Sequence, residues 1–231
     1  MGIIEFLKGK IIVSSQAMPD EPMYKEDSMR SMMQSVVNGG AEALRVAGAR
    51  DVKIAKSLNV VVIGITKPSK LPENWKETVY ITPTVNDTKE LIEAGADIIA
   101  FDGTMRTRPN NESLNDIIKF IHSQNKIAMA DISNLHEGLN SALLGADIIS
   151  TTLAGYTKES ESSPADSPDY ELLEKLVQKI NKPIFLEGRI WEPYQVQKAF
   201  DMGAHSVVIG SAITRPQLIT KRFINYKNNK D

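Results

Sequence analysis

Charged side chains end several of the short apolar runs in this chain, and their types could perform proton transfer. Lys67 follows the run VVVIGIT, while Asp131 and Glu187 lie near the ends of two later runs. A lysine partly removed from water loses affinity for its proton and becomes a base near neutral pH. Carboxylates beside it could act as acid and base or orient sugar hydroxyls. A solvent-exposed loop lysine and structural ion pairs are open alternatives.

The corresponding position is polar, or glycine, after most of the other apolar runs. The residues there are Gln16, Arg45, Asp102, Thr151, Thr152, Gly210 and Ser211. Charges crowded together must pair or stay hydrated, so such a set favours a site for a polar ligand. For Asp102, a local pair with Arg106 that orders a loop is an open alternative to a catalytic role.

Two later segments have the composition of a phosphate site. EGRIWEP (187–193) contributes Gly188 and Arg189, and GSAITRP (210–216) leads into a predicted helix. Glycines let backbone N–H groups approach phosphate oxygens, and a helix that begins there favours negative charge. The guanidinium of Arg215 could add a bidentate contact. The alternative is a tight turn at Gly210 and a surface charge at Arg215.

A repeated Gly-Ala pattern indicates the elements that position these residues. It occurs in GGAEALRV, AGADIIAF, LGADIIST and MGAHSVVI, at spacings of 55, 50 and 58 residues. Each spacing has room for two helix–strand units. The glycine is typical of a helix end, and the apolar run after it is typical of a buried strand. Four further runs, at 11–17, 60–66, 127–133 and 183–188, raise the number of predicted strands to eight.

Amphipathic stripes predict helices between these strands, for example over 29–37, 114–121 and 173–180. Capping-box spacings and prolines suggest where helices begin, namely at Asp87 with Glu90, at Asn134 with Glu137, and at Pro168 and Pro193.

Strict alternation of strand and helix over 1–231 predicts one domain, a (β/α)₈ barrel. A doubly wound open sheet is the alternative, because periodicity cannot separate the two. In a barrel the catalytic residues lie where strands end. Two long loops, 66–79 and 154–168, follow strand ends and could be lids or solvated spacers.

Composition excludes several classes of function. The 231 residues carry 27 Lys+Arg and 29 Asp+Glu, a net charge of −2, so a nucleic-acid binder relying on bulk positive charge is excluded. The absence of cysteine excludes disulfides and thiolate chemistry. The three histidines lack metal-ligand spacing, and no dinucleotide or P-loop motif occurs. No apolar run is long enough to span a membrane, so we expect a cytoplasmic protein. Because metal-ligand spacing and nucleotide motifs are missing, we expect neither a metal nor a cofactor.

With these residues placed, the chain resembles the N-acetylmannosamine-6-phosphate 2-epimerase (NanE) family over almost its whole length. The motifs that carry the resemblance are IIVSSQAMPDEPMY, LRVAGARDV, VVIGITK, DGTMRTRP, MADIS, EGLNSALLGADIISTTLAGYT, LEGRIWEP and VVIGSAITRPQLITKRF. The resemblance implies a (β/α)₈ barrel that interconverts N-acetylmannosamine 6-phosphate and N-acetylglucosamine 6-phosphate. It also implies a role in sialic-acid and amino-sugar catabolism, without a cofactor. We expect a homo-oligomer, most simply a dimer, that binds neither nucleic acid nor membrane.

The resemblance also implies roles for individual residues. Lys67 matches the family's catalytic lysine, which works at C2, and Glu187 matches the glutamate that handles the hydroxyl protons of ring opening. We expect substrate contacts from Gln16, Arg45, Asp131 and Thr152, and phosphate contacts from Gly188, Arg189, Gly210, Ser211 and Arg215. The sequence departs from the family at Pro68-Ser69, within 82–87 and at Gly103, all in two neighbouring loops.

Two other functions stay open at this point. A Schiff-base aldolase or lyase acting on a phosphorylated sugar would also use a lysine at the barrel mouth and a phosphate site. A sugar-phosphate-binding regulator without chemistry is the other alternative, although Lys67 and Glu187 argue against it.

Overall fold

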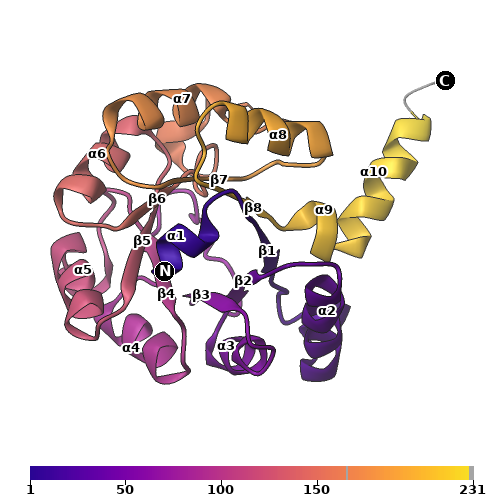
Figure 1. The fold of residues 1–231 in the computed structure, drawn as a ribbon, viewed down its shortest axis with the longest axis horizontal. Coiled ribbons are helices and arrows are strands. Elements are labelled where there is room, and N and C mark those ends of the chain that lie inside the picture. Colours follow the sequence, from indigo (N-terminus) through magenta and orange to yellow (C-terminus); the bar gives the residue numbers. More distant parts are fainter. Residues whose placement is uncertain (165, 229–231) are drawn as a thin grey trace.

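Eight parallel strands close into a barrel in the computed structural model, which describes residues 1–164 and 166–228 (Figure 1). The strands are β1 (Ile11–Ser15), β2 (Ala43–Ala47), β3 (Val61–Ile65), β4 (Ile98–Asp102), β5 (Ile127–Asp131), β6 (Ile148–Ser150), β7 (Ile184–Glu187) and β8 (Ser206–Ile209). They follow one another in chain order, and β8 pairs with β1 to close the ring. The predicted (β/α)₈ barrel is confirmed, and the open sheet is excluded. The proposed boundaries, 1–231, reach residues 229–231, which lie outside the described part.

Helices follow every strand and surround the barrel (Figure 1). They are α2 (Glu26–Asn38), α3 (Ala49–Lys56), α4 (Val85–Glu93), α5 (Leu114–Ser123), α6 (Leu135–Leu143), α7 (Tyr170–Lys179), α8 (Pro193–Asp201), α9 (Ser211–Thr214) and α10 (Pro216–Asn228). A short helix, α1 (Ile3–Leu7), precedes β1 and covers the end of the barrel where strands begin, with Leu7 fully buried in the interior. Single 3₁₀ turns lie at Pro22–Tyr24, Pro109–Asn111 and Lys158–Ser160.

Alternation along the strands divides the core in two, because successive side chains point to opposite faces. One set packs inside the barrel and includes Ile63, Met129 and Phe185. The other set packs against the helices and includes Leu44 and Phe101. Polar residues that end a strand on the inward-facing positions therefore converge on the barrel axis.

The four predicted Gly-Ala helix ends are confirmed. The glycine in each has a positive φ, 101° at Gly40, 101° at Gly95, 104° at Gly145 and 92° at Gly203. Glycine adopts this left-handed conformation without a steric penalty, which lets the helix stop and the chain turn into the next strand.

Two predicted helix starts are wrong and two are confirmed. Helix α4 is capped by Thr84 with Asp87 as the third residue of the helix, so the predicted Asp87–Glu90 box lies one turn too late. Asn134 accepts from the backbone of Glu137 as predicted, and Pro193 opens α8. Pro168 instead precedes the Asp169 cap of α7. The Asp87 carboxylate also accepts a hydrogen bond from the Thr66 hydroxyl at 2.8 Å, a long-range contact that the local sequence pattern does not include.

Among the described residues, no helix combines the length and the apolar character that crossing a membrane requires.

Candidate active site

A cavity of about 420 Å³ opens at the carboxyl ends of the strands, where the barrel fold predicts chemistry. It brings together most of the predicted site residues: Gln16, Lys67, Thr152, Glu187, Gly188, Arg189, Gly210, Ser211 and Arg215. The two others, Arg45 and Asp131, lie inside the barrel and do not line the cavity, with 1% and 0% of their side-chain surface exposed. Segments far apart in the sequence therefore build one site above a buried ion pair.

The buried pair is bidentate. Arg45 donates from Nη1 to Asp131 Oδ1 at 2.9 Å and from Nη2 to Oδ2 at 2.5 Å. Its Nη1 also lies 3.0 Å from Oε2 of Glu187, whose side chain is 14% exposed toward the cavity. The barrel interior thus supports Glu187 from below through one guanidinium shared by two carboxyl groups.

Electrostatics distinguish the members of this cluster. Burial opposes the charge on Arg45, but the carboxylates of Asp131 and Glu187 outweigh it and raise the pKa of the guanidinium. Burial raises the pKa of Glu187, with Asp131 adding to the rise and Arg45 and Lys67 opposing it. Arg45 is therefore a permanent cation, whereas Glu187 retains its proton to a higher pH than an ordinary glutamate.

Lys67 reaches the same cavity from the end of β3. Lys67 is accessible to solvent, yet it lines the cavity at the barrel mouth, where other residues surround it. This desolvation, with the positive charge of Arg45, lowers the pKa of the ammonium to about 8, and Glu187 and Asp131 limit the fall. No described residue forms a hydrogen bond or ion pair with Lys67. A free amine with a pKa near 8 can serve as a general base at neutral pH.

Gln16 and Thr152 lie between the cluster and the cavity. Gln16 donates to the Ser14 hydroxyl at 2.9 Å, while its buried Oε1 has no partner among the described residues and can accept from a ligand hydroxyl. The Thr152 hydroxyl contacts Asp131 Oδ1 at 2.6 Å and Glu187 Oε2 at 3.2 Å. Gln16 thus keeps one acceptor for a ligand, and Thr152 contacts the carboxyl groups of both Asp131 and Glu187.

The predicted phosphate side lies where β7 and β8 end. Gly188 has a φ of 112°, and Gly210 precedes the first turn of α9, whose leading N–H groups have no helical acceptor. Arg215 forms an ion pair with Glu21, and its buried Nε has no partner among the described residues. This edge of the cavity therefore presents unpaired N–H donors, as an anion requires.

Arg189 lines the cavity, and its guanidinium also contacts the protein. Its Nη1 donates to the Ala154 carbonyl at 2.8 Å, and its guanidinium lies 4.5 Å from the ring centroid of Tyr156. The guanidinium is therefore engaged by the loop after β6, and its contact with a phosphate stays a prediction.

Asp102 and Arg106 form the loop-ordering pair that the sequence left open. Arg106 Nη2 donates to Asp102 Oδ2 at 2.6 Å, and Nη1 donates to the Lys76 carbonyl at 2.8 Å. The long loop after β3 is therefore fastened to the loop after β4. Tyr80, which lines the cavity, lies nearby, and burial with the charge of Asp102 raises the pKa of its phenol to about 12.

Sequence reasoning missed Ser150, Tyr80 and Glu21. Ser150 lies two positions after the inward-facing Ile148 and therefore on the same face of β6, a signal that alternation provides. Tyr80 and Glu21 are in loops, where no periodicity predicts the direction of a side chain.

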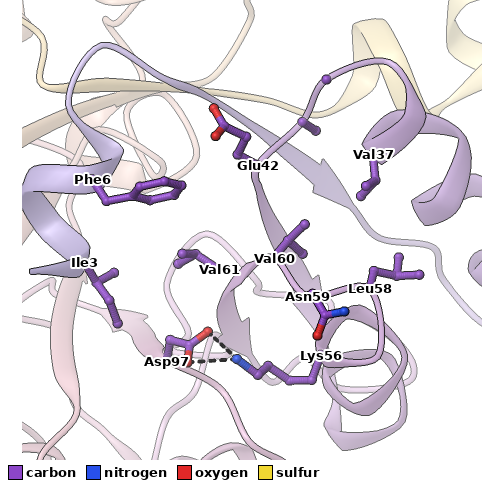
Figure 2. Close-up of a pocket in the computed structure, with 12 residues that line it drawn as sticks. Ile3, Phe6, Val37, Glu42, Lys56, Leu58, Asn59, Val60, Val61 and Asp97 are labelled. Atoms are coloured by element: carbon purple, nitrogen blue, oxygen red, sulfur yellow. Dashed lines mark hydrogen bonds and ion pairs between the residues drawn. The ribbon is translucent and has the colours of Figure 1, made fainter. Parts of the chain in front are cut away.

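A larger cavity, of about 660 Å³, lies at the opposite end of the barrel (Figure 2). Its charged groups are already neutralised: Lys56 pairs with Asp97 at 2.8 Å, and Glu42 pairs with Lys10. Asp97 also accepts from the backbone of Val62, so it serves the strand junction. Size alone therefore does not identify the reactive end, and the mouth with Lys67 is the better candidate.

Fold and site together define a (β/α)₈-barrel protein whose mouth holds Lys67 and Glu187 above the buried Arg45–Asp131 ion pair. The chain matches the family described as "Putative N-acetylmannosamine-6-phosphate epimerase" over residues 29–229. It belongs to this N-acetylmannosamine-6-phosphate epimerase family, which confirms the resemblance drawn from the motifs.

Individual relatives cover nearly the whole chain. A protein of Clostridium perfringens, described as a putative N-acetylmannosamine-6-phosphate 2-epimerase, is 44% identical over 96% of this chain and 98% of its own. A relative of the same description from Clostridioides difficile is 41% identical over 96% of this chain and 97% of its own. The solved N-acetylmannosamine-6-phosphate 2-epimerase from Clostridium perfringens superimposes with a TM-score of 0.92 at 42% identity, covering 98% of this chain and 96% of that one. At 16% identity and a TM-score of 0.63, 3-hexulose-6-phosphate synthase of Salmonella typhimurium shares the fold alone.

Proposed function

We propose that this chain interconverts N-acetylmannosamine 6-phosphate and N-acetylglucosamine 6-phosphate in amino-sugar catabolism. The observation that carries the proposal is one cavity lined by Lys67, whose pKa is lowered, and by Glu187, whose pKa is raised, next to the ends of β7 and β8. Membership of the epimerase family agrees with it.

Epimerisation at C2 first requires ring opening, because C1 carries no carbonyl in the closed sugar. The C1–O5 bond breaks, O5 takes a proton from a carboxylic acid, and the C1 hydroxyl gives its proton to the resulting carboxylate, which leaves an aldehyde. Glu187 is suited to supply the proton for O5, since burial keeps its carboxyl protonated to a higher pH than usual. Gln16 Oε1 can accept from a sugar hydroxyl and so orient the ring.

The aldehyde makes the C2 proton acidic. Neutral Lys67 takes this proton, and the electron pair of the C–H bond forms an enolate. The enolate turns about its C2–C3 bond, and the Lys67 ammonium, after exchange with solvent, returns a proton to the opposite face of C2, which completes the inversion. The negative charge that develops on O1 is stabilised by the positive potential of Arg45 and of the newly protonated Lys67. The buried pair with Asp131 holds Arg45 in one orientation throughout.

Turnover of N-acetylmannosamine 6-phosphate, followed by proton NMR, tests the proposal. We expect wild type to form N-acetylglucosamine 6-phosphate and Lys67→Ala to lose at least 100-fold in rate, the lower end of a typical general-base contribution of about 10²–10⁴. Lys70→Ala is the matched control, because Lys70 is an exposed lysine of the same loop. Absence of product with wild type would refute the function.

The same samples test the aldolase alternative. A lysine that forms a Schiff base is alkylated irreversibly when borohydride is added with the substrate. We expect wild type to recover full activity after this treatment, and permanent inactivation with covalent labelling of Lys67 would support the aldolase instead.

We further propose that the enzyme works as a cytoplasmic homodimer, as expected from the family resemblance. Light scattering at several protein concentrations tests the dimer, and a constant monomer mass would exclude it.

A further inference from the structure

The Thr152 hydroxyl is within hydrogen-bond distance of three oxygen atoms. They are Asp131 Oδ1 at 2.6 Å, Ser150 Oγ at 2.9 Å and Glu187 Oε2 at 3.2 Å. A hydroxyl has one proton to donate and two lone pairs that accept. Thr152 can therefore donate to one of these oxygens and must accept from the others.

Asp131 is the acceptor of the Thr152 proton. Its contact is the shortest of the three and has the length of a hydrogen bond to an ionised carboxylate. Both of its oxygens also accept from Arg45, and its side chain is fully buried, so it is the ionised partner of that guanidinium. Thr152 consequently has no second proton to offer to Glu187.

Ser150 and Glu187 must then donate to Thr152. The Ser150 hydroxyl, which is fully buried, can rotate to donate to Thr152. Glu187 can donate only if Oε2 carries a proton, since two bare oxygens at 3.2 Å would repel. The same oxygen still accepts from Arg45 Nη1 at 3.0 Å. With this assignment Thr152 donates once and accepts twice, and all its hydrogen-bonding capacity is used.

We propose that Thr152, oriented by Ser150, is a positioning residue that keeps a proton on Glu187 and leaves Asp131 ionised. The charged groups that face Glu187 are Arg45 on β2, Lys67 after β3 and Asp131 on β5. Asp131 favours the protonated acid, and the two cations oppose it. A hydrogen bond donated by Thr152 would also lower the pKa of Glu187, but the one proton of that hydroxyl is held by Asp131 at 2.6 Å. Given the proposed epimerase function, the acid needed for ring opening is in place before the substrate arrives.

Thr152 therefore has a different role from the predicted substrate contact. Its single proton is committed to Asp131, so it has no free donor for a sugar hydroxyl. Its contribution acts through Glu187 and should be visible without substrate.

Infrared titration of the carboxyl groups tests the proton assignment. Glu187→Gln subtracted from wild type isolates the band of protonated Glu187, since other buried carboxyls such as Asp102 and Glu137 are common to both proteins. In Thr152→Val, which keeps the shape and removes the hydroxyl, protonated Glu187 loses its acceptor. We expect the midpoint of its band to fall by roughly one pKa unit, the effect of one lost hydrogen bond. Thr152→Ser should restore it.

The sign of the shift decides the outcome. If Thr152 instead donated to an ionised Glu187, its removal would raise the midpoint, and that result would overturn the proposal. A band already absent at neutral pH in wild type would overturn it as well. The titration uses no substrate, so a loss of the proposed epimerase function would leave this result standing, and turnover without the expected shift would refute the proton assignment alone.

Discussion

At the scale of single residues, the reactivity of the site depends on how protein surroundings change two proton affinities in opposite directions. Desolvation favours the neutral amine of Lys67 and the neutral acid of Glu187. Each group is thereby moved toward the form that the proposed reaction needs, a base for C2 and an acid for the ring oxygen. An ordinary lysine and glutamate in water would both hold the opposite form at neutral pH.

The pH dependence of kcat/KM should show the lowered pKa of Lys67. The base must be neutral, and the neutral fraction grows as pH rises through about 8. For C2-proton exchange of an open-chain substrate analogue, which needs no acid from Glu187, we therefore expect kcat/KM to increase about tenfold per pH unit below that value and then to level. Initial rates between about pH 6 and 9 measure it. A profile that is flat or falls over this range would contradict a lysine base.

The division of labour between Lys67 and Glu187 can be separated with an open-chain analogue of the substrate. The analogue needs no ring opening, so Glu187→Gln should catalyse exchange of the analogue's C2 proton with solvent at nearly the wild-type rate. Lys67→Ala should stay about 10²–10⁴-fold slower with the analogue, because the base itself is missing. Proton NMR measures the exchange. Normal exchange in the Lys67 variant would transfer the role of base to another group.

Much of the candidate site could be predicted from sequence at this scale. Polar residues at strand ends indicated Lys67, Arg45, Asp131 and Glu187, because parallel strands deliver their last residues to one rim. The burial of Arg45 and Asp131 beneath the cavity was not predictable from type, since strand length and barrel geometry decide how deep an inward-facing residue lies. The direction of the Arg189 side chain depends on a loop contact with Ala154 that no pattern encodes.

At the scale of elements, the loops after β3, β4 and β6 hold one another in place. Arg106 links the first two, as described above. Lys76 pairs with Glu161 at 2.8 Å, and Lys158 pairs with Glu77 at 2.9 Å, which links the loops after β3 and β6. These last pairs are exposed and individually weak, so the buried Arg106 contact provides most of the connection.

Arg106→Met should therefore destabilise the protein and loosen the loop after β3. The change leaves the fully buried Asp102 without its ion-pair partner, which typically costs about 3–5 kcal/mol. Urea unfolding measures the loss, and limited proteolysis should cut within 66–84 sooner than in wild type. Adding Asp102→Asn should recover part of the stability, because the uncompensated charge is removed. Unchanged stability in Arg106→Met would show that Arg108 compensates fully.

Element positions were predicted better than element ends. The strands agree with the apolar runs to within about two residues, since continuous apolar runs are what a sheet buried on both faces requires. The predicted start of α4 was wrong because several side chains there are suited to cap the helix. The Asp87 carboxylate also bonds to Thr66 on another segment, and a local pattern does not include such a contact.

At the scale of the whole molecule, the barrel separates its two ends. The charged residues that line the cavity where strands begin are paired, whereas at the opposite mouth Lys67 has no partner among the described residues and the buried Nε of Arg215 is unpaired. A phosphorylated sugar can therefore be held by its phosphate at the ends of β7 and β8 while its C1 and C2 face Lys67 and Glu187 across the cavity.

Phosphate should consequently contribute to catalysis as well as to binding. Remote binding energy can support kcat, so unphosphorylated N-acetylmannosamine should have a much lower kcat/KM than its 6-phosphate. Arg215→Gln should weaken the preference, and Arg222→Gln, which alters an exposed arginine of α10, should leave it unchanged. Steady-state kinetics with both sugars provide the comparison. Equal kcat/KM values in wild type would exclude the phosphate cradle.

Proton NMR of the wild-type enzyme with N-acetylmannosamine 6-phosphate in D₂O tests the central mechanism most directly. The proposed route removes the C2 proton to Lys67, an amine in contact with solvent, and returns a solvent-derived proton. The product should therefore carry deuterium at C2, at a rate that EDTA does not change, and Lys67→Ala should show neither product nor exchange. Product that retains the original C2 hydrogen at early conversion would contradict proton abstraction by a solvent-exchanging base.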